Sequence, residues 1–552
     1  MARQAQDAPN QPFDPFNLGD TFMELFTRLM SDPATLWEKQ MELWQDYLQL
    51  WQSTTNKILG EQDKPVISPD PKDRRFRDEA WQENTVFDFI KQSYLLTARW
   101  MQHTAHDASK TMTPQMAKKL EFYTRQFVDA MSPSNFLLTN PEVLKATLES
   151  KGENLAKGLE NMLEDLERGK GKLRISMTDL SAFKIGKNLA ITPGKVVFQN
   201  DLMQLIQYEP TTKTVSQIPL LIVPAWINKF YILDLQPENS TVKWLTDQGY
   251  TVFMISWVNP DENLNKKTFE DYMVEGPLAA MDVIEEITGE HEINIAGYCL
   301  GGTLVATTLA WLAARHEQKR IKSVTYLTTM VDFTEAGELS VFIDEEQLAA
   351  LENRMTQMGF LDGSEMATTF SMLRANDLIW SFVVNNYLLG KDPFPFDLLY
   401  WNADSTRMPA AMHSYYLRNM YQKNLLAKGS LKLRGETIDL TQIDVPTFIL
   451  SCREDHIAPW KSTYAATQLY KGPVEFVLAA SGHIAGVINP PAKKKYSHWV
   501  WQKKSVLPAK PEEWFKGASE QPGSWWPHWQ AWQEQFTGKQ IPARKIGSAK
   551  YK

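Results

Sequence analysis

The sequence predicts an α/β protein with a mainly parallel sheet, preceded by a separate helical domain. Short apolar runs, such as residues 293–296 and 446–451, have the length of buried strands. A longer apolar stretch, residues 303–314, follows the first of them and has the length of a helix. The first 190 residues differ, because they are rich in tryptophan and methionine at helical spacing. We therefore expect a helical domain over residues 1–190 and an α/β domain over residues 191–552.

Two helix starts are predicted near the N-terminus. Thr21 and Glu24 have the spacing of a capping box, and Asp32-Pro33 combines a cap residue with a first-turn proline. Apolar residues at alternating steps of four and three form one stripe along the second helix: Trp37, Met41, Trp44, Leu48 and Trp51. The stripe either packs inside the domain or docks on a hydrophobic surface or partner. Prolines among charges over residues 61–75 predict a linker.

A cysteine occupies the centre of a G-x-nucleophile-x-G pattern, Gly297-Tyr298-Cys299-Leu300-Gly301. Such a turn joins a strand to a helix, and its small neighbours let the apex side chain stand exposed at the sheet edge. A thiol at the N-terminus of a helix lies near the positive end of the backbone dipole, which favours the thiolate. Cys299 is therefore a candidate nucleophile, and a small packed cysteine is the alternative.

Candidate partners follow in the chain order nucleophile, acid, histidine, which is the order of α/β hydrolases. Asp455 comes after the predicted strand 446–451, and His483 comes after the predicted strand 474–478. Parallel strands end at the same sheet edge, so we predict a Cys299, Asp455 and His483 triad on an α/β-hydrolase core. His456 adjoins the acid in sequence and cannot easily receive its hydrogen bond while facing Cys299. We therefore give His456 a supporting role.

An acyl-transfer site also needs donors for an oxyanion. We expect the amide of Leu300 and a second amide from the loop after residues 218–223, around Trp226 and Ile227. Asp234 is expected to anchor this region, and Asp261 to be a turn residue. Between the predicted strand 324–330 and the strand at 446, residues 331–440 form an aromatic-rich insertion that predicts a cap over the site.

Composition narrows the function classes. The chain has 552 residues, 43% hydrophobic and 22% charged, enough for a catalytic core and a second domain. No apolar run approaches membrane-spanning length and the start lacks a signal pattern, so we expect a cytoplasmic protein. The net charge of −8 argues against nonspecific nucleic-acid binding. No cysteine and histidine cluster has zinc-ligand spacing, so no metal or other cofactor is expected, and Cys452 is read as a core residue.

Long strings of the sequence resemble the polyhydroxyalkanoate synthases, which polymerise 3-hydroxyacyl-CoA thioesters. These strings include GYCLGGTL, REDHIAPW, SGHIAGVINPP, PGSWWPHW and, from Ile227, INKFYILDLQPENS. The resemblance implies that Cys299 holds the growing polyester as a thioester and that His483 activates it. It implies that Asp455 either orients His483 or helps deprotonate the 3-hydroxyl group of the incoming unit. Coenzyme A is then part of the substrate and product rather than a cofactor.

The resemblance also implies partners. It implies a homodimer with Trp401 at dimer contacts, although core packing explains Trp401 equally well. It assigns granule association to the N-terminal region, with granule-associated proteins as further partners. The single long chain, PGSWWPHW and Ala485 resemble synthases for short chains, which makes (R)-3-hydroxybutyryl-CoA the first choice. The ending Ala549-Lys550-Tyr551-Lys552 departs from the usual family ending, which puts the tail contacts in doubt.

Other functions fit parts of the same pattern. A cysteine-dependent thioesterase or polyester hydrolase would use the same triad and differ only in admitting water. A granule-binding scaffold could keep the fold without turnover, although the intact triad argues against it. Arg418 and Asn419 are candidates for lining a path for coenzyme A, because guanidinium groups recognise phosphate.

Overall fold

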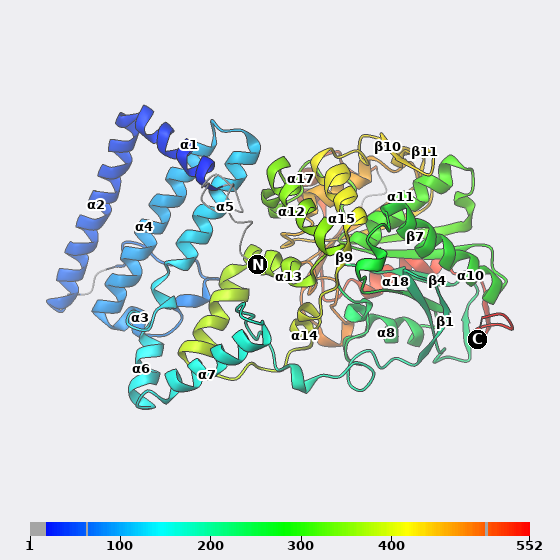
Figure 1. The fold of residues 1–552 in the computed structure, drawn as a ribbon, viewed down its shortest axis with the longest axis horizontal. Coiled ribbons are helices and arrows are strands. Elements are labelled where there is room, and N and C mark those ends of the chain that lie inside the picture. The colour runs from blue at the N-terminus through cyan, green and yellow to red at the C-terminus, as the bar shows by residue number, and fades with distance from the viewer. Residues whose placement is uncertain (1–17, 62–63, 503–505, 552) are drawn as a thin grey trace, which may run out of the picture. The chain divides into compact units, whose positions relative to one another are not determined.

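The computed structural model describes residues 18–61, 64–502 and 506–551, and the chain divides into two compact units (Figure 1). The helical unit comprises Met1–Asp179 and Thr368–Phe394. The α/β unit comprises Leu180–Ala367 and Pro395–Lys552. The division thus lies shortly before residue 190, and the middle of the expected cap, 331–440, belongs with the helical unit.

The helical unit begins with two helices whose starts test the sequence analysis. The second begins at Pro33, directly after Asp32, which confirms that helix start. The first begins at Leu18, so Thr21 lies inside it and the predicted capping box is wrong. Helices pack here through apolar faces, and the helix bounds are α1 (Leu18–Ser31), α2 (Pro33–Ile58), α3 (Ala80–Glu83), α4 (Thr85–Ser109), α5 (Pro114–Ala130), α6 (Pro141–Glu149) and α7 (Glu153–Arg168).

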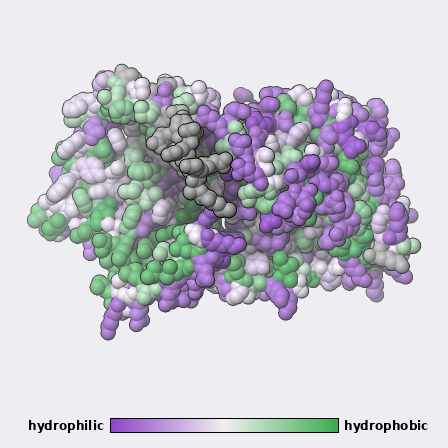
Figure 2. Space-filling view, in the orientation of Figure 1, coloured by the Kyte–Doolittle hydropathy of each residue, from purple (hydrophilic) through white to green (hydrophobic). Residues whose placement is uncertain are grey.

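The apolar stripe of α2 is exposed rather than packed inside the unit. Trp37 is 69% exposed, Trp44 59% and Trp51 63%. The helix instead contacts α4 through other residues, since the Tyr47 hydroxyl hydrogen-bonds Thr97 at 2.8 Å. Figure 2 shows further hydrophobic residues gathered on the surface of this unit. An exposed apolar surface of this kind is typical of a contact site.

The inserted segment Thr368–Phe394 is held to α7 by polar contacts and close packing. The Tyr387 hydroxyl donates to Asp165 Oδ2 (2.6 Å), and Asn154 Nδ2 donates to the Leu388 carbonyl (2.8 Å). A Cβ placed on Gly158 would lie 1.9 Å from the Tyr387 carbonyl oxygen. Only glycine therefore allows this approach of helix to segment. These contacts explain why the segment folds with the helical unit.

The α/β unit contains a ten-stranded sheet in the order β1-β2-β5-β4-β6-β7-β12-β13-β14-β15. The six strands from β5 to β13 pair in parallel, and the strands at both edges pair antiparallel. The strand bounds are β1 (Gly194–Gln199), β2 (Met203–Tyr208), β4 (Leu220–Val223), β5 (Val252–Trp257), β6 (Ile293–Tyr298), β7 (Ile321–Leu327), β12 (Thr447–Cys452), β13 (Val474–Ala479), β14 (Ser497–Val500) and β15 (Ser519–Pro522).

The central strands are buried on both faces. Leu221 and Val223 of β4 point into one hydrophobic cluster, and Leu220 and Ile222 point into the other. Continuous apolar runs are expected for strands of a covered parallel sheet. Helices of the unit are α8 (Thr241–Asp247), α9 (Phe269–Met273), α10 (Ala279–Thr288), α11 (Leu300–Ala314), α16 (Trp460–Tyr464), α17 (Pro511–Gly517) and α18 (Trp526–Gln533). This architecture and the topology of the sheet confirm the predicted fold class.

The rest of the insertion stays with the α/β unit. Its helices are α12 (Glu345–Met358), α14 (Asp397–Ala403) and α15 (Ala410–Tyr416), and a π-helical turn, η11 (Leu417–Gln422), continues α15. We call residues 331–367 and 395–440 the cap. The C-terminal tail packs on the same unit, because β16 (Gln540–Pro542) pairs with β3 (Thr214–Ser216) and the Tyr551 ring lies 6.0 Å from that of Phe198. Within the described residues, no helix has the length and apolarity needed to cross a membrane.

Candidate active site

Cys299 stands at the sharp turn between β6 and α11. Its backbone has φ 52° and ψ −121°, a left-handed conformation that costs energy for a residue with a side chain. The surrounding glycines are required by close packing: a Cβ on Gly297 would lie 2.4 Å from Gly302 Cα, and one on Gly301 2.1 Å from the Val223 carbonyl oxygen. The pattern that predicted a nucleophile turn therefore corresponds to a strained strand-to-helix turn with Cys299 at its apex.

Asp455 and His483 meet at the same edge of the sheet. Asp455 follows β12, and its Oδ1 accepts from the amides of Ile457 (2.8 Å) and Ala458 (2.9 Å). His483 follows β13, and its Nδ1 donates to Asp455 Oδ2 (2.6 Å). Both residues are 7% exposed. The two amides fix the carboxylate, which leaves one oxygen to hold the imidazole.

The imidazole of His483 also lies in the neighbourhood of Cys299. Burial opposes the charged imidazole, but the neighbouring Asp455 and Cys299 outweigh burial and raise the pKa of His483 well above its ordinary value. A more basic imidazole is a better acceptor for the thiol proton. Asp455 and His483 are therefore placed as the acid and the base of a candidate triad with Cys299.

His456 does not take the place of His483. The carboxylate of Asp455 is occupied by His483 and by two backbone amides. The carbonyl of His456 instead lies against Gly337, where a Cβ would come within 2.9 Å of it. His456 is thus a neighbour of the site rather than the partner of its carboxylate.

The sequence analysis did not single out Tyr298, which contacts His483. Its hydroxyl points at the His483 carbonyl (3.4 Å), and the two rings lie 5.7 Å apart. Tyr298 is 2% exposed, and burial raises its pKa well above the ordinary value, so the phenol stays neutral. Its place beside the nucleophile, at a free position of the motif, was the available signal.

The cap supplies aromatic side chains next to Cys299. The ring of Phe333 lies 6.0 Å from that of Tyr416 and 4.9 Å from that of Tyr421, and Tyr416 and Tyr421 lie 5.6 Å apart. Phe333 and Tyr416 belong to the hydrophobic cluster against which Cys299 and Tyr421 pack. Burial raises the pKa of both phenols, Tyr416 and Tyr421. The aromatic content of the insertion predicted such a cap, but not which of its residues share a cluster with Cys299.

The loop expected to supply the second oxyanion donor comprises residues 224–227, and we call it the oxyanion loop. Gly301, next to Leu300, packs against Val223 and Pro224, so this loop meets the first turn of α11. Leu300 is the first residue of α11, and a first-turn amide has no acceptor within its own helix. The Trp226 ring is 1% exposed and packs among aromatic residues, including Tyr416 at 6.4 Å.

Asp234 lies near this loop as a buried anchor. Its Oδ1 accepts from the hydroxyls of Thr192 (2.5 Å) and Ser240 (2.6 Å), and burial raises its pKa. Asp261 caps a short helical turn by accepting from the Asn263 amide (2.9 Å). Both contacts are structural, in agreement with the supporting roles expected for them.

Two cap predictions meet a different environment. Trp401 is only 6% exposed, and its indole donates to the Lys229 carbonyl (2.7 Å), so within one chain it packs internally. The guanidinium of Arg418 is held by Glu352 (2.6 Å) and Glu345 (3.0 Å), which would compete with a phosphate. Asn419 donates to the Tyr415 carbonyl (2.8 Å).

Cys452 is fully buried, and burial raises its pKa, as for a core thiol.

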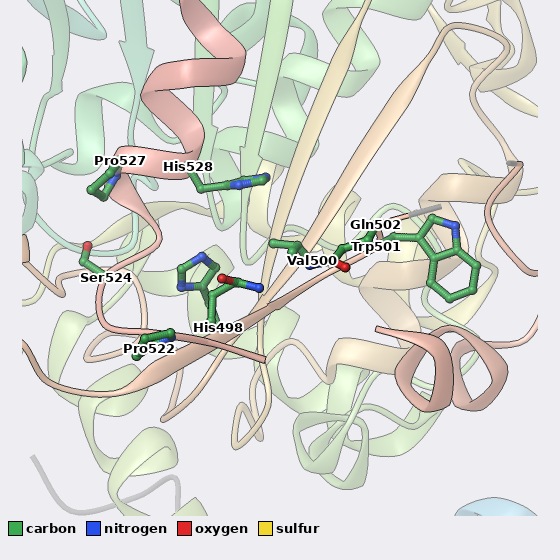
Figure 3. A pocket seen from close by; sticks show the side chains of 9 residues that line it. His498, Val500, Trp501, Gln502, Pro522, Ser524, Pro527 and His528 are labelled. Carbon is green, nitrogen blue, oxygen red and sulfur yellow. The ribbon is translucent and has the colours of Figure 1, made fainter. Parts of the chain in front are cut away.

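A pocket of about 600 Å³ opens elsewhere on the α/β unit (Figure 3). It is lined by residues of β14, β15 and the start of α18, including His498 and His528, whose rings are 6.0 Å apart. None of Cys299, Asp455 and His483 lines it. The side chain of His528 is held by Glu475 (2.9 Å). The pocket is therefore separate from the candidate active site.

Comparison with known proteins gives the same fold and a family. The sequence model described as "alpha/beta hydrolase fold" matches residues 218–490, and "Poly-beta-hydroxybutyrate polymerase (PhaC) N-terminus" matches residues 72–245. The poly(3-hydroxyalkanoate) polymerase of Methylorubrum extorquens is 50% identical over 99% of this chain and 93% of its own. The corresponding polymerase subunit of Rhizobium meliloti strain 1021 is 49% identical over 94% and 84%. That of Cupriavidus necator strain H16 is 48% identical over 87% and 81%.

The sheet order, the strained Cys299 turn and the matching sequence model define a protein of the α/β-hydrolase fold. Within that fold the extent of identity is decisive, since it covers both units of the chain. The chain belongs to the poly(3-hydroxyalkanoate) polymerase family and is an acyltransferase.

Proposed function

We propose that this chain polymerises (R)-3-hydroxyacyl-CoA, with 3-hydroxybutyryl-CoA as the first choice, through an acyl thioester on Cys299. One observation carries the proposal. The imidazole of His483, held by the carboxylate of Asp455 at 2.6 Å, lies in the neighbourhood of Cys299, which stands at the apex of a nucleophile turn. In a chain about half identical to named polymerases, this is the arrangement that acyl transfer from a thioester requires.

The chemistry follows from the groups present. His483 takes the thiol proton, and the Cys299 sulfur attacks the thioester carbonyl of the substrate. The amide of Leu300 and an amide of the oxyanion loop, from Trp226 or Ile227, stabilise the negative oxygen. The tetrahedral species then expels the coenzyme A sulfur, which takes the proton from His483 and leaves as the thiol. Exchange of one thioester for another is nearly balanced, so the acyl group is not trapped on the enzyme.

Chain growth needs a second nucleophile at the same carbonyl. His483 takes the proton of the 3-hydroxyl group of a hydroxyacyl unit as the oxygen attacks the thioester on Cys299. An ester bond forms, the bond from the carbonyl carbon to the Cys299 sulfur breaks, and His483 gives the proton to that sulfur. Water competes with this alcohol at far higher concentration, so the site must exclude it. The aromatic residues Phe333, Tyr416 and Tyr421, which share a hydrophobic cluster with Cys299, support such exclusion.

The exposed stripe of α2 supports association of the helical unit with the polyester product. Trp37, Trp44 and Trp51 are each at least 59% exposed. Burial of these large apolar side chains against a hydrophobic polymer would lower the free energy. In this proposal the enzyme is a cytoplasmic homodimer that works at polyester granules together with granule-associated proteins. Trp401 remains the proposed dimer residue, through its effect on the cap.

The test is direct. The purified chain is incubated with 3-hydroxybutyryl-CoA, free coenzyme A is followed, and both product and intact protein are weighed. We expect polymer and oligomeric hydroxybutyryl adducts on Cys299, and their loss in Cys299→Ala. Cys452→Ala is the matched control, since the chain has two cysteines and this one is buried. Release of coenzyme A with only free 3-hydroxybutyrate would instead identify a cysteine-dependent thioesterase or polyester hydrolase.

A further inference from the structure

A short stretch of the cap, residues 401–406, is hydrogen-bonded to the chain that leaves the oxyanion loop. We call this stretch the cap latch. The indole Nε1 of Trp401 donates to the Lys229 carbonyl (2.7 Å). Asp404 accepts from the Tyr231 hydroxyl (2.8 Å) and forms an ion pair with Lys229 (2.7 Å). Ser405 forms an isolated bridge with Asn228. Residues 401–405 are thus bonded to residues 228–231.

The latch ends on the oxyanion loop itself, at Thr406. The Thr406 hydroxyl donates to the Trp226 carbonyl, and the Thr406 amide donates to the Ile227 carbonyl (3.2 Å). Thr406 is 2% exposed, so water does not compete for these bonds. On the other side, the Trp257 indole donates to the Pro224 carbonyl (2.8 Å). Three carbonyls of the loop are therefore held by fixed donors.

Holding a carbonyl also fixes an amide. A peptide group is planar and trans, so the carbonyl of Trp226 and the N–H of Ile227 point in opposite directions in one rigid plane. The Thr406 hydroxyl, by orienting that carbonyl, sets the direction of the Ile227 N–H. Within the described residues, the amides of Ala225, Trp226 and Ile227 donate to no backbone carbonyl. They are thus available to an oxyanion, provided that their directions are fixed in advance.

We propose that the cap latch positions the oxyanion loop, and that Thr406 is the positioning residue that aims the Ile227 amide at the acyl oxygen. Thr406 does not touch the reacting atoms and acts only through the Trp226–Ile227 peptide. The latch makes the cap a functional part of the acyl-transfer site, because the direction of the loop amide depends on whether the cap latch is bonded to the oxyanion loop. This inference rests on the proposed acyl transfer at Cys299.

The substitution that isolates the hydroxyl is Thr406→Val, which keeps the shape of the side chain. A donor that loses its aim costs roughly 10-fold to 100-fold in rate, less than complete removal of an oxyanion donor. Because the loop contributes more to the transition state than to substrate binding, kcat should fall by that factor while KM stays within about threefold. Thr406→Ser restores the hydroxyl and should recover most of kcat. Thr356→Val, which removes an exposed hydroxyl bonded within α12, is the matched control.

A second measurement does not depend on turnover. Hydrogen exchange of the peptide covering residues 224–231 should speed up in Thr406→Val and in Tyr231→Phe, which removes the bond to Asp404, but not in Thr356→Val. Unchanged kcat and unchanged exchange in Thr406→Val would overturn the latch. Equal falls of kcat in Thr406→Val and Thr406→Ser would also refute the role of the hydroxyl. Failure of the proposed function shows separately, as absence of polymer from the unaltered chain, and exchange alone then decides the latch.

Discussion

Replacing Asp455 by asparagine separates the two roles that a carboxylate could have here. The substitution keeps size and shape, and an amide oxygen can still accept from the amides of Ile457 and Ala458. The remaining amide nitrogen then faces His483 Nδ1, which donates to Asp455 Oδ2 at 2.6 Å in the unaltered chain. Since an amide nitrogen is itself a donor, it favours the imidazole tautomer with its proton on Nε2, the nitrogen that should accept from Cys299.

The expected loss is large. A triad that keeps its geometry but has the wrong imidazole tautomer loses about 10⁴-fold in kcat, as the serine protease case shows. The change also removes the charge that raises the pKa of His483 against the effect of burial, so the imidazole becomes a weaker base. We therefore expect Asp455→Asn to lower the rate of Cys299 acylation by about 10²-fold to 10⁴-fold.

The assay is single-turnover release of coenzyme A from 3-hydroxybutyryl-CoA, with mass spectrometry of the acylated protein. Asp282→Asn is the control, because that carboxylate is 70% exposed. If Asp455 mainly orients His483, acylation and elongation fall together. If Asp455→Asn acylates at the normal rate but elongates poorly, the carboxylate mainly serves the substrate hydroxyl, and the reasoning from the His483 contact is refuted.

Three further predictions concern stability. Burial lowers the pKa of His413 from 6.5 to about 4. The neutral imidazole therefore contributes fully to the free energy of unfolding above pH 6.5, and about 3 kcal/mol of that free energy is lost as the pH falls toward 4. In denaturant titrations His413→Gln should flatten this pH dependence, and His316→Gln, at an exposed position, should not. Arg544→Ala removes a donor to two carbonyls and to the Glu290 carboxylate, which keeps only its bond from Gln217, and should cost about 2–3 kcal/mol of unfolding free energy. An unchanged unfolding midpoint would contradict the tail packing. Gly158→Ala should cost about 1–3 kcal/mol and speed proteolysis within residues 368–394, because its Cβ would overlap the Tyr387 carbonyl; normal resistance would show that α7 does not hold the segment.

The candidate site was accessible from the sequence because its three residues are each tied to the end of a predicted strand. Turn glycines and apolar runs are local signals, and Cys299, Asp455 and His483 inherit their placement from β6, β12 and β13. The acid–base contact of 2.6 Å follows because β12 and β13 are parallel neighbours in the sheet, a pairing that the sequence analysis did not predict. The limits of the strands were less accurate, because β7 spans Ile321–Leu327 whereas the predicted strand covered residues 324–330.

Contacts between residues far apart in the chain could not be predicted from the sequence. Nothing in residues 368–394 shows that they fold with the helical unit, because the contacts depend on α7, more than 200 residues earlier in the chain, as with Asn154 and Leu388. The environment of Trp401 was equally open, since a large aromatic residue suits an interface and a core alike. The pairing of Arg418 with Glu345 and Glu352 needed the facing helix α12 to be known.

The triad alone does not distinguish a polymerase from a hydrolase, because the same imidazole that assists a hydroxyl group would assist water. The distinction must come from groups that decide which nucleophile reaches the thioester, and in this chain those groups belong to the cap. Phe333, Tyr416 and Tyr421 place aromatic surface beside Cys299, while Thr406 holds the oxyanion loop. A cap that both excludes water and aims the loop amide would make acyl transfer efficient only when it is in place, so that the thioester is reactive mainly while it is protected from hydrolysis.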